Sequence, residues 1–228
     1  MSVPDTSRTP VREVASTSVA AAPRTSVSFP DPRHPVHLPP DICVWVCGHS
    51  LIFWAHKHAQ ESRWGNNLEL VEHGIRLRWL GIRGMYWDQL LPTLHQASCF
   101  SAPVLILIHL GGNDLCKVKG VHLIRQMKSD LLFVACTFPR ARMVWSHILP
   151  RRCWRDAHKP AAVERLPKRV NAEISKFVSM LGGLVLVHDL ISVDCPGLFR
   201  PDGVHLSVIG LNIFLSVLQD LIGSCFGR

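Results

Sequence analysis

The chain has 228 residues, of which 47% are hydrophobic, and its formal net charge is +8. This length allows one substantial domain plus a tail. We expect no segment that is long and apolar enough to span a bilayer. We also expect no secretory signal, because the N-terminus lacks a continuous apolar run, and therefore an intracellular protein of the cytoplasm or the nucleus.

Residues 1–40 differ in composition from the rest of the chain. They are rich in Ser, Thr, Ala and Pro, hold eight of the sixteen prolines, and contain no Trp, Ile or Cys. Such a stretch buries too little apolar surface to repay the entropy lost on ordering. The composition predicts a disordered tail over residues 1–40 and a folded domain over residues 41–228.

Five strand-like runs follow one another in the folded part, separated by segments with helical spacing. The runs cover residues 42–47, 75–80, 104–110, 143–149 and 184–187. Nearly continuous apolar strands that alternate with helices indicate a parallel sheet covered on both faces. The sequence therefore predicts an α/β protein, a three-layer α/β/α sandwich around a five-stranded parallel sheet.

Three helix-like segments carry apolar stripes at spacings of three and four residues. The stripes are Val121, Ile124, Met127, Leu131 and Val134; Val170, Ile174, Phe177 and Leu181; and Ile209, Ile213, Val217 and Leu221. Such stripes are typical of helix faces that pack on a core. Ser207 is placed to cap the last of these helices.

Ser50 follows the first strand directly and precedes a helix-like segment. It is either a nucleophile exposed at a tight turn or a serine that caps the helix. The surrounding residues do not form the GxSxG pattern of a nucleophile elbow.

Two further strands end in residues suited to an oxyanion site. Asn113 follows the third strand, and its side-chain amide can donate hydrogen bonds to a developing negative charge. Gly84 follows the second strand and lets the backbone N–H approach a reacting group. Both also fit ordinary turns.

Asp202 and His205 stand three residues apart, just before the last helix-like segment. That spacing lets the carboxylate reach Nδ1 of the imidazole and leaves Nε2 free to face a serine. A surface Asp that caps a helix is the other interpretation. Ligands bind beyond the carboxyl ends of parallel strands, so Ser50, Gly84, Asn113 and this pair are all expected at one edge.

In this order, four short blocks resemble those of the SGNH (GDSL-like) hydrolase family. The blocks are Gly48-His49-Ser50-Leu51, Gly81-Ile82-Arg83-Gly84, Gly111-Gly112-Asn113-Asp114 and Asp202-Gly203-Val204-His205. The resemblance spans roughly residues 42–222. It implies a flavodoxin-like fold with five parallel strands and the hydrolysis of carboxylic esters through an acyl-enzyme, without a cofactor or a metal.

The resemblance also implies roles for individual residues. Ser50 would be the nucleophile, His205 the base and Asp202 the residue that orients the base. The oxyanion hole would consist of the Ser50 and Gly84 backbone N–H groups and the Asn113 side chain.

One difference from the family is plain, because His49 stands where the family has an Asp before the serine. The Gly-His-Ser variant, the Trp content and the tail-plus-domain layout also look like SGNH domains found with mobile genetic elements in animal genomes.

The eight cysteines and thirteen histidines predict neither disulfides nor a metal site. There is no CxxC pair, and the spacings match no zinc module. Several cysteines lie in apolar runs or on expected helices, among them Cys43, Cys47, Cys136 and Cys225. We expect reduced, buried thiols.

Residues 151–169 carry seven positive and two negative side chains, a net charge of +5. Clustered Arg and Lys can bind phosphates, so an alternative function is a catalytically weak SGNH-fold binding module. It would contact nucleic acid through Arg151, Arg152 and Arg155. A solvated loop and helix face explains the same charges. A nucleotide-binding protein is disfavoured, because the first strand is followed by neither a GxGxxG run nor a P-loop.

Overall fold

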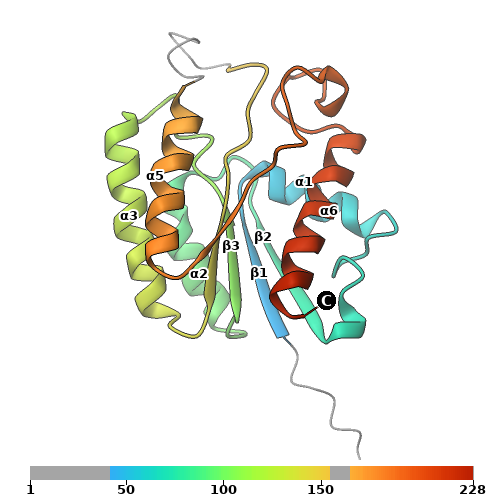
Figure 1. The fold of residues 1–228 in the computed structure, drawn as a ribbon, viewed down its shortest axis with the longest axis vertical. Helices are drawn as coiled ribbons and strands as arrows, with labels where there is room; N and C mark the ends of the chain where they lie inside the picture. The colour runs from blue at the N-terminus through green and yellow to red at the C-terminus, as the bar shows by residue number, and fades with distance from the viewer. Residues whose placement is uncertain (1–41, 155–164, 228) are drawn as a thin grey trace, which may run out of the picture. The chain divides into compact units, whose positions relative to one another are not determined.

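A parallel β-sheet lies between two layers of helices in the computed structural model of the protein (Figure 1). The structure describes residues 42–154 and 165–227. The predicted disordered tail, residues 1–40, lies outside the described residues, so its state stays a prediction.

The sheet has five strands, as predicted. They are β1 (Ile42–Gly48), β2 (Ile75–Gly81), β3 (Leu105–His109), β4 (Arg142–Ser146) and β5 (Leu184–Leu186). Their order across the sheet is β2-β1-β3-β4-β5, and every neighbouring pair is parallel. This is the flavodoxin-like order, with a topological switch point between β1 and β3.

The fourth strand ends three residues earlier than the predicted run 143–149. Ile148 and Leu149 are buried although they lie in the loop that follows. The Asn171 side chain accepts from Ile148 N at 2.9 Å and donates to Ile148 O at 3.0 Å. These two bonds satisfy the backbone polar groups of Ile148, which can therefore be buried without belonging to a strand. This is why the apolar pattern of the sequence continues past the end of β4.

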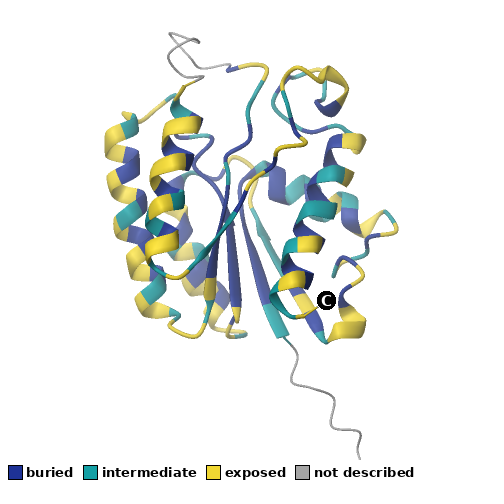
Figure 2. Cartoon of the chain, viewed as in Figure 1, coloured by how far each residue is buried: buried dark blue, intermediate teal, exposed yellow. Residues whose placement is uncertain are grey.

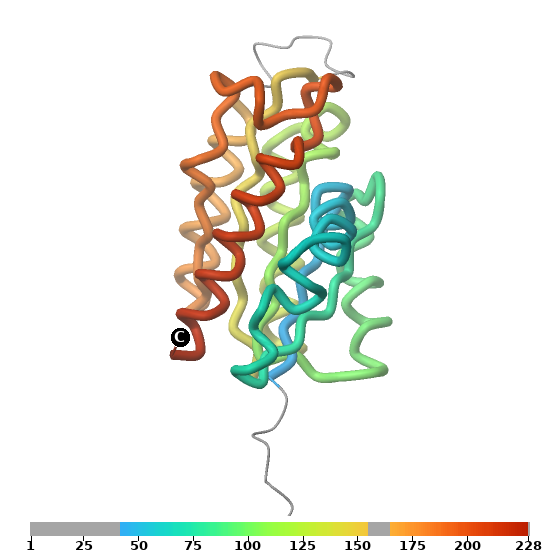
Figure 3. Tube along the Cα trace, turned by 90° about the vertical axis from the view of Figure 1, so that its right-hand side faces the viewer, coloured from blue at the N-terminus to red at the C-terminus, as the bar shows by residue number. Residues whose placement is uncertain are grey.

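The helices cover both faces of the sheet. The described helices are α1 (Ser50–Gln60), α2 (Leu90–Ser98), α3 (Gly120–Thr137), α5 (Leu166–Met180) and α6 (Val208–Cys225). Short 3₁₀ helices are η1 (Val71–His73), η2 (Trp87–Gln89) and η3 (Pro196–Leu198). Helices α1 and α6 pack on one face, and α2, α3 and α5 on the other (Figures 1 and 3).

The core is divided by the sheet into two apolar clusters, because successive residues of a strand point to opposite faces. Val44 and Val46 of β1 pack with Phe214 of α6. Trp45 and Cys47 belong to the cluster on the other face. The central strands are accordingly buried on both sides (Figure 2), which explains why they are almost wholly apolar.

Two of the predicted helix stripes are confirmed in part. In α3, the side chains of Ile124, Met127, Leu131 and Val134 are buried, but Val121 is 50% exposed at the start of the helix. In α5, Val170 and Ile174 are buried, while Phe177 and Leu181 are only partly buried.

The third predicted stripe is also confirmed only in part, because Ile213, Val217 and Leu221 pack against the core without being fully buried. Ile209 is 61% exposed, and Ile213, Val217 and Leu221 are only partly buried. The core face of α6 consists of Gly210, Leu211, Phe214, Leu215, Leu218, Gln219, Ile222 and Gly223. The helix is apolar on most sides, so the pattern did not identify one face. The predicted cap is confirmed, because Ser207 Oγ accepts from Gly210 N at 3.2 Å.

The expectation that no segment has the length and apolarity of a membrane span was also wrong. Among the described residues, α6 meets that test by length and composition, with a mean hydropathy of 1.6. In the structure, 44% of this helix is buried inside the domain. A core helix with this packing explains the composition.

All eight cysteines are free thiols, but only some are buried as expected. Cys47 lies in the core, where burial raises the pKa of its thiol to about 12. Cys136 is exposed, as are Cys99, Cys153 and Cys195.

Candidate active site

Ser50 begins α1 directly after β1, at the carboxyl edge of the sheet. The turn is tight, because a Cβ at Gly48 would lie 2.2 Å from the His109 carbonyl oxygen. Glycine is therefore required for this close approach of two strands. As the first residue of α1, Ser50 has a backbone N–H without an acceptor inside the helix.

His49 caps α1 and completes the serine turn. Its Nδ1 accepts a hydrogen bond from Leu51 N at 3.2 Å. Burial, followed by the charges of Arg151 and His205, lowers the pKa of the His49 imidazole to about 3. His49 is therefore neutral, and because Nδ1 is an acceptor, the ring proton is on Nε2.

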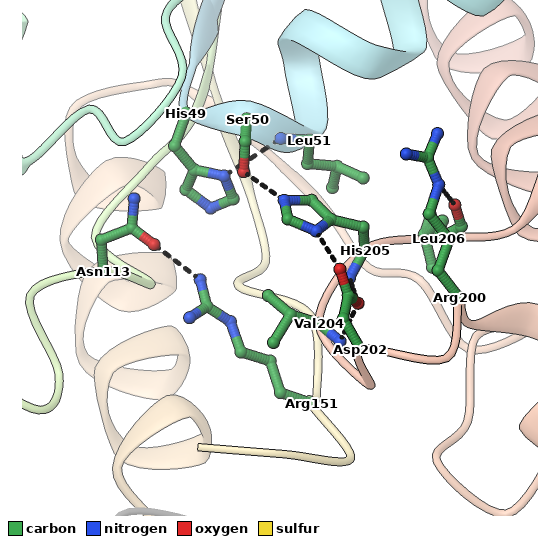
Figure 4. A network of polar contacts seen from close by, with 10 residues as sticks. All are labelled: His49, Ser50, Leu51, Asn113, Arg151, Arg200, Asp202, Val204, His205 and Leu206. Carbon is green, nitrogen blue, oxygen red and sulfur yellow. Dashed lines mark hydrogen bonds and ion pairs between the residues drawn. The ribbon is translucent and has the colours of Figure 1, made fainter. Parts of the chain in front are cut away.

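His205 links Ser50 to Asp202 (Figure 4). The His205 Nε2 atom lies 3.1 Å from Ser50 Oγ, and His205 Nδ1 lies 2.7 Å from Asp202 Oδ2. The second carboxylate oxygen, Oδ1, accepts from Val204 N at 2.8 Å and from His205 N at 2.9 Å. The structure thus brings together the three side chains that the sequence singled out, across 155 positions of the chain.

The charge of Asp202 fixes the tautomer of His205. Burial alone would raise the pKa of the Asp202 carboxyl, but hydrogen bonds from the His205 side chain and from two backbone N–H groups outweigh it. The resulting pKa lies well below the usual range. An ionised Asp202 accepts from His205 Nδ1–H, which leaves Nε2 to accept the Ser50 hydroxyl proton.

Asn113 lies beside Ser50, His205 and Asp202, and hydrogen bonds to both its amide nitrogen and its amide oxygen fix the plane of the side chain. Its Nδ2 donates to Met85 O at 3.0 Å, and its Oδ1 accepts from Arg151 Nη2 at 3.0 Å (Figure 4). An amide nitrogen carries two hydrogens, so one N–H of Asn113 is not used by Met85.

Gly84 lies in the loop after β2, which runs next to the serine turn. The parallel register aligns Gly81 with Gly48, and Ile82 N donates to Gly48 O at 3.0 Å. Gly84 itself is exposed and has a φ of 75°. Glycine adopts this left-handed conformation without strain. Its role as an oxyanion donor stays a prediction.

Arg151 lies in this site, although the charge run in the sequence had indicated a nucleic-acid contact for it. A Cβ at Gly112 would lie 2.8 Å from Arg151 Nη2 and 3.2 Å from His49 Nε2, so the two side chains converge there. Burial lowers the pKa of Arg151, although Cys116 and Asp202 oppose this. Its position shortly after the fourth predicted strand could have indicated the site, since the carboxyl ends of parallel strands share one edge.

The predicted nucleic-acid contact involved three arginines. Arg151 points into the site, whereas Arg152 is exposed and Arg155 lies outside the described residues. The three are therefore not shown to form one surface, and nucleic-acid binding stays a prediction.

A series of buried polar side chains lies behind the serine turn, at the ends of β3, β4 and β5. His109 Nδ1 lies 2.9 Å from Ser146 Oγ, which lies 2.8 Å from His188 Nε2. The His109 ring contacts the His49 ring edge to face, with centroids 5.1 Å apart. Burial lowers the pKa of His188 to about 3 and that of His109 well below its ordinary value. These imidazoles are neutral.

Three adjoining cavities share Arg151 as a wall residue. A small one is lined by Ser50, His205, His49 and His109. A second, of about 140 Å³, is lined by Gly112, Asn113, Trp154 and His205. A third, of about 490 Å³, is lined mainly by residues 147–151, Trp154, Lys168, Asn171 and residues 187–189. Among the described residues, no group of three or more His, Cys, Asp or Glu side chains is arranged to hold a metal.

The sequence matches no protein-family model and no curated protein. The structure, however, is similar to many solved structures. A GDSL-like lipase from Bacteroides thetaiotaomicron superposes with a TM-score of 0.65 at 15% identity, over 81% of this chain and 89% of the lipase. An acetylxylan esterase from Geobacillus stearothermophilus superposes with a TM-score of 0.61 at 14% identity, over 81% of this chain and 95% of the esterase.

A third similar structure is described as a putative platelet activating factor from Streptococcus pneumonia. Its TM-score is 0.61 at 20% identity, over 83% of this chain and 86% of that protein. These likenesses show that the chain has the three-layer α/β fold of GDSL-like lipases and acylhydrolases.

Proposed function

We propose that the protein is a serine hydrolase that cleaves carboxylic esters through an acyl-enzyme formed on Ser50. The supporting observation is the hydrogen-bonded series from Ser50 Oγ through His205 to Asp202, with distances of 3.1 and 2.7 Å. A serine hydroxyl becomes an effective nucleophile when an imidazole accepts its proton and a carboxylate orients that imidazole. The fold shared with lipases and an acetylxylan esterase also supports a hydrolase.

Acylation begins when Ser50 Oγ forms a bond to the carbonyl carbon of the ester and its proton passes to His205 Nε2. Negative charge develops on the carbonyl oxygen. The Ser50 and Gly84 backbone N–H groups and the free N–H of Asn113 Nδ2 would stabilise that charge. The bond to the alcohol oxygen then breaks, and the alcohol leaves with the proton from His205.

Deacylation repeats these steps with water. Water gives a proton to His205 Nε2 as its oxygen attacks the acyl carbon. The bond to Ser50 Oγ breaks, Ser50 recovers the proton, and the carboxylic acid is released. Asp202 stays ionised throughout and stabilises the transient imidazolium.

Labelling with a fluorophosphonate probe tests this proposal, because the probe reacts only with an activated serine. We expect the wild-type protein to be labelled and the Ser50→Ala variant not to be. Ser98→Ala is the matched control, since Ser98 is exposed on α2 and should leave labelling unchanged. Absence of labelling in folded wild-type protein, or labelling that persists without Ser50, would contradict the proposal.

A further inference from the structure

Arg151 places a positive charge against the reacting residues. Its guanidinium lies between Asn113, whose Oδ1 it contacts at 3.0 Å, and the Asp202–His205 turn (Figure 4). Its charge contributes to the lowered pKa of His49, while the charge of Asp202 favours the charged form of Arg151. The proposed steps of acylation and deacylation do not use this charge, so its role has to be found elsewhere.

Among the residues that the structure describes, the hydrogen bonds of Arg151 leave most of its donors unused. A guanidinium has five N–H groups in a planar fork. Within the described part of the chain, Asn113 Oδ1 is its hydrogen-bond acceptor, and no carboxylate forms an ion pair with it. The charge of Asp202 acts on Arg151 electrostatically, while the Asp202 carboxylate accepts hydrogen bonds from His205 and Val204. Trp154 packs over the guanidinium at 5.0 Å from the ring centroid, which holds the side chain in place.

Arg151 also lines each of the three adjoining cavities at this edge of the described structure. It lines the small cavity at Ser50, the 140 Å³ cavity at Asn113 and the 490 Å³ cavity beyond them. The largest cavity holds the charged side chains of Arg151, Lys168 and Asp189, together with His147 and His188. Positive charge therefore exceeds negative charge around it, even with both histidines neutral.

Arg151 thus combines a partly desolvated guanidinium, donors that the described residues leave unused and a position on three adjoining cavities, which together suit an anionic ligand. We propose that Arg151 is a specificity-determining residue that binds an anionic group of the substrate. The preferred substrates are then esters that carry a carboxylate or phosphate on the acid or alcohol part, near the ester bond. The planar fork suits either anion, because it can donate two parallel hydrogen bonds. This inference rests on the proposed ester hydrolysis at Ser50.

Two pairs of esters test the inference. They also show whether the anionic group that Arg151 binds belongs to the alcohol part or to the acid part of the substrate. For the alcohol part, 4-acetoxybenzoate is compared with the neutral 4-acetoxybenzamide. For the acid part, mono-4-nitrophenyl adipate is compared with its terminal amide. The readout is the ratio of kcat/KM for the anionic ester over the neutral ester. Effects of Arg151 on Asn113 act on both members of a pair and cancel in that ratio.

We expect the wild-type ratio to exceed one for at least one pair, and Arg151→Met to lower that ratio by about tenfold or more. Arg151→Lys should retain part of it. Arg152→Met is the matched control, because Arg152 is exposed next to Arg151 and should leave the ratio unchanged. A wild-type ratio near one for both pairs would overturn the inference, and so would an Arg151→Met ratio equal to that of the wild type. Neither result would affect the proposal that the protein hydrolyses esters.

A binding measurement keeps the inference testable if hydrolysis itself fails. The Ser50→Ala variant is titrated with 4-hydroxybenzoate and with monomethyl adipate. The double variant Ser50→Ala/Arg151→Met is titrated with the same two compounds. Binding that depends on Arg151 would support an anion site whatever the catalytic result. Equal binding by both proteins, or none at millimolar concentration, would contradict it.

Discussion

His49 Nδ1 accepts a hydrogen bond from Leu51 N at 3.2 Å, and thereby caps the helix that presents Ser50. The resemblance to GDSL-like hydrolases places an Asp at this position, and the change to His left open whether the serine turn keeps its hydrogen bonds. The structure shows that a neutral imidazole supplies an acceptor there. The replacement therefore alters the charge beside Ser50 but retains a side-chain cap.

Replacing His49 should show how much this cap contributes. We expect His49→Ala to lower the free energy of unfolding by about 1 kcal/mol from the lost cap, with a further loss from the cavity that it leaves. His49→Asn keeps a capping oxygen and should be less destabilised. Urea denaturation measures both variants. Equal destabilisation of the two would show that the hydrogen bond to Leu51 N contributes little.

Neutralising Asp202 should abolish most activity without unfolding the domain. In Asp202→Asn, the His205 tautomer with its proton on Nδ1 is no longer favoured, so we expect kcat to fall by roughly 10⁴-fold, as for comparable triads. The measurement is ester hydrolysis at saturating substrate. Asp194→Asn is the control, because Asp194 is exposed and contacts Ser192 rather than the site. A loss below tenfold would argue against a triad.

Truncation of Asn113 tests the oxyanion hole. We expect Asn113→Ala to reduce kcat by about 10²–10³-fold, the usual effect of removing one donor, while KM changes little. Because Asn113 also contacts Met85 and Arg151, thermal unfolding should be followed in parallel. A rise in KM with unchanged kcat would assign Asn113 to substrate binding instead.

The buried histidines should make the protein less stable in acid. The folded-state pKa values of His49 and His188 are about 3, against an ordinary value of 6.5, so the unfolded chain binds protons that the folded chain does not. Stability is then full above pH 6.5 and falls as the pH drops toward 3, by up to about 1.4 kcal/mol per pH unit for each group. Asp114 partly offsets this loss of stability in acid. Burial raises the pKa of its carboxyl to about 6, so below that pH the folded chain binds a proton more readily than the unfolded chain.

Urea denaturation at pH 7, 6 and 5 measures that slope. His188→Gln removes one of the groups and should reduce the slope by about one proton relative to wild type. His95→Gln, on the exposed surface of α2, is the matched control. An unchanged slope in His188→Gln would mean that His188 is protonated in the folded protein.

Much of the fold and the grouping of the site could be predicted from the sequence. Strands that are buried on both faces consist almost wholly of apolar residues, so the five strands could be counted from the apolar runs in the sequence. A parallel sheet brings the carboxyl ends of its strands to one edge, and this is why Ser50, Asn113 and His205 could be expected together although they are far apart in the chain.

Other features depend on tertiary packing and were missed. The core face of α6 could not be identified, because Ile209 and Phe214 are equally apolar and only the position of the helix on the sheet decides which is buried. Arg151 was grouped with neighbouring charges of the same sign, since a charge run in a sequence does not reveal which side chain turns inward. The cap formed by His49 was missed because imidazole is an uncommon capping group.

The packing of α6 also has a consequence for synthesis on the ribosome. Within the described residues, α1 and α6 cover the same face of the sheet, and α6 is translated about 150 residues after α1. A nascent chain that already contains Ser50 exposes that apolar face until α6 emerges. His205 lies directly before α6 and emerges with it. The growing polypeptide therefore acquires the proposed base only when α6 can cover that face, so under the proposed mechanism incomplete chains would carry an unactivated serine.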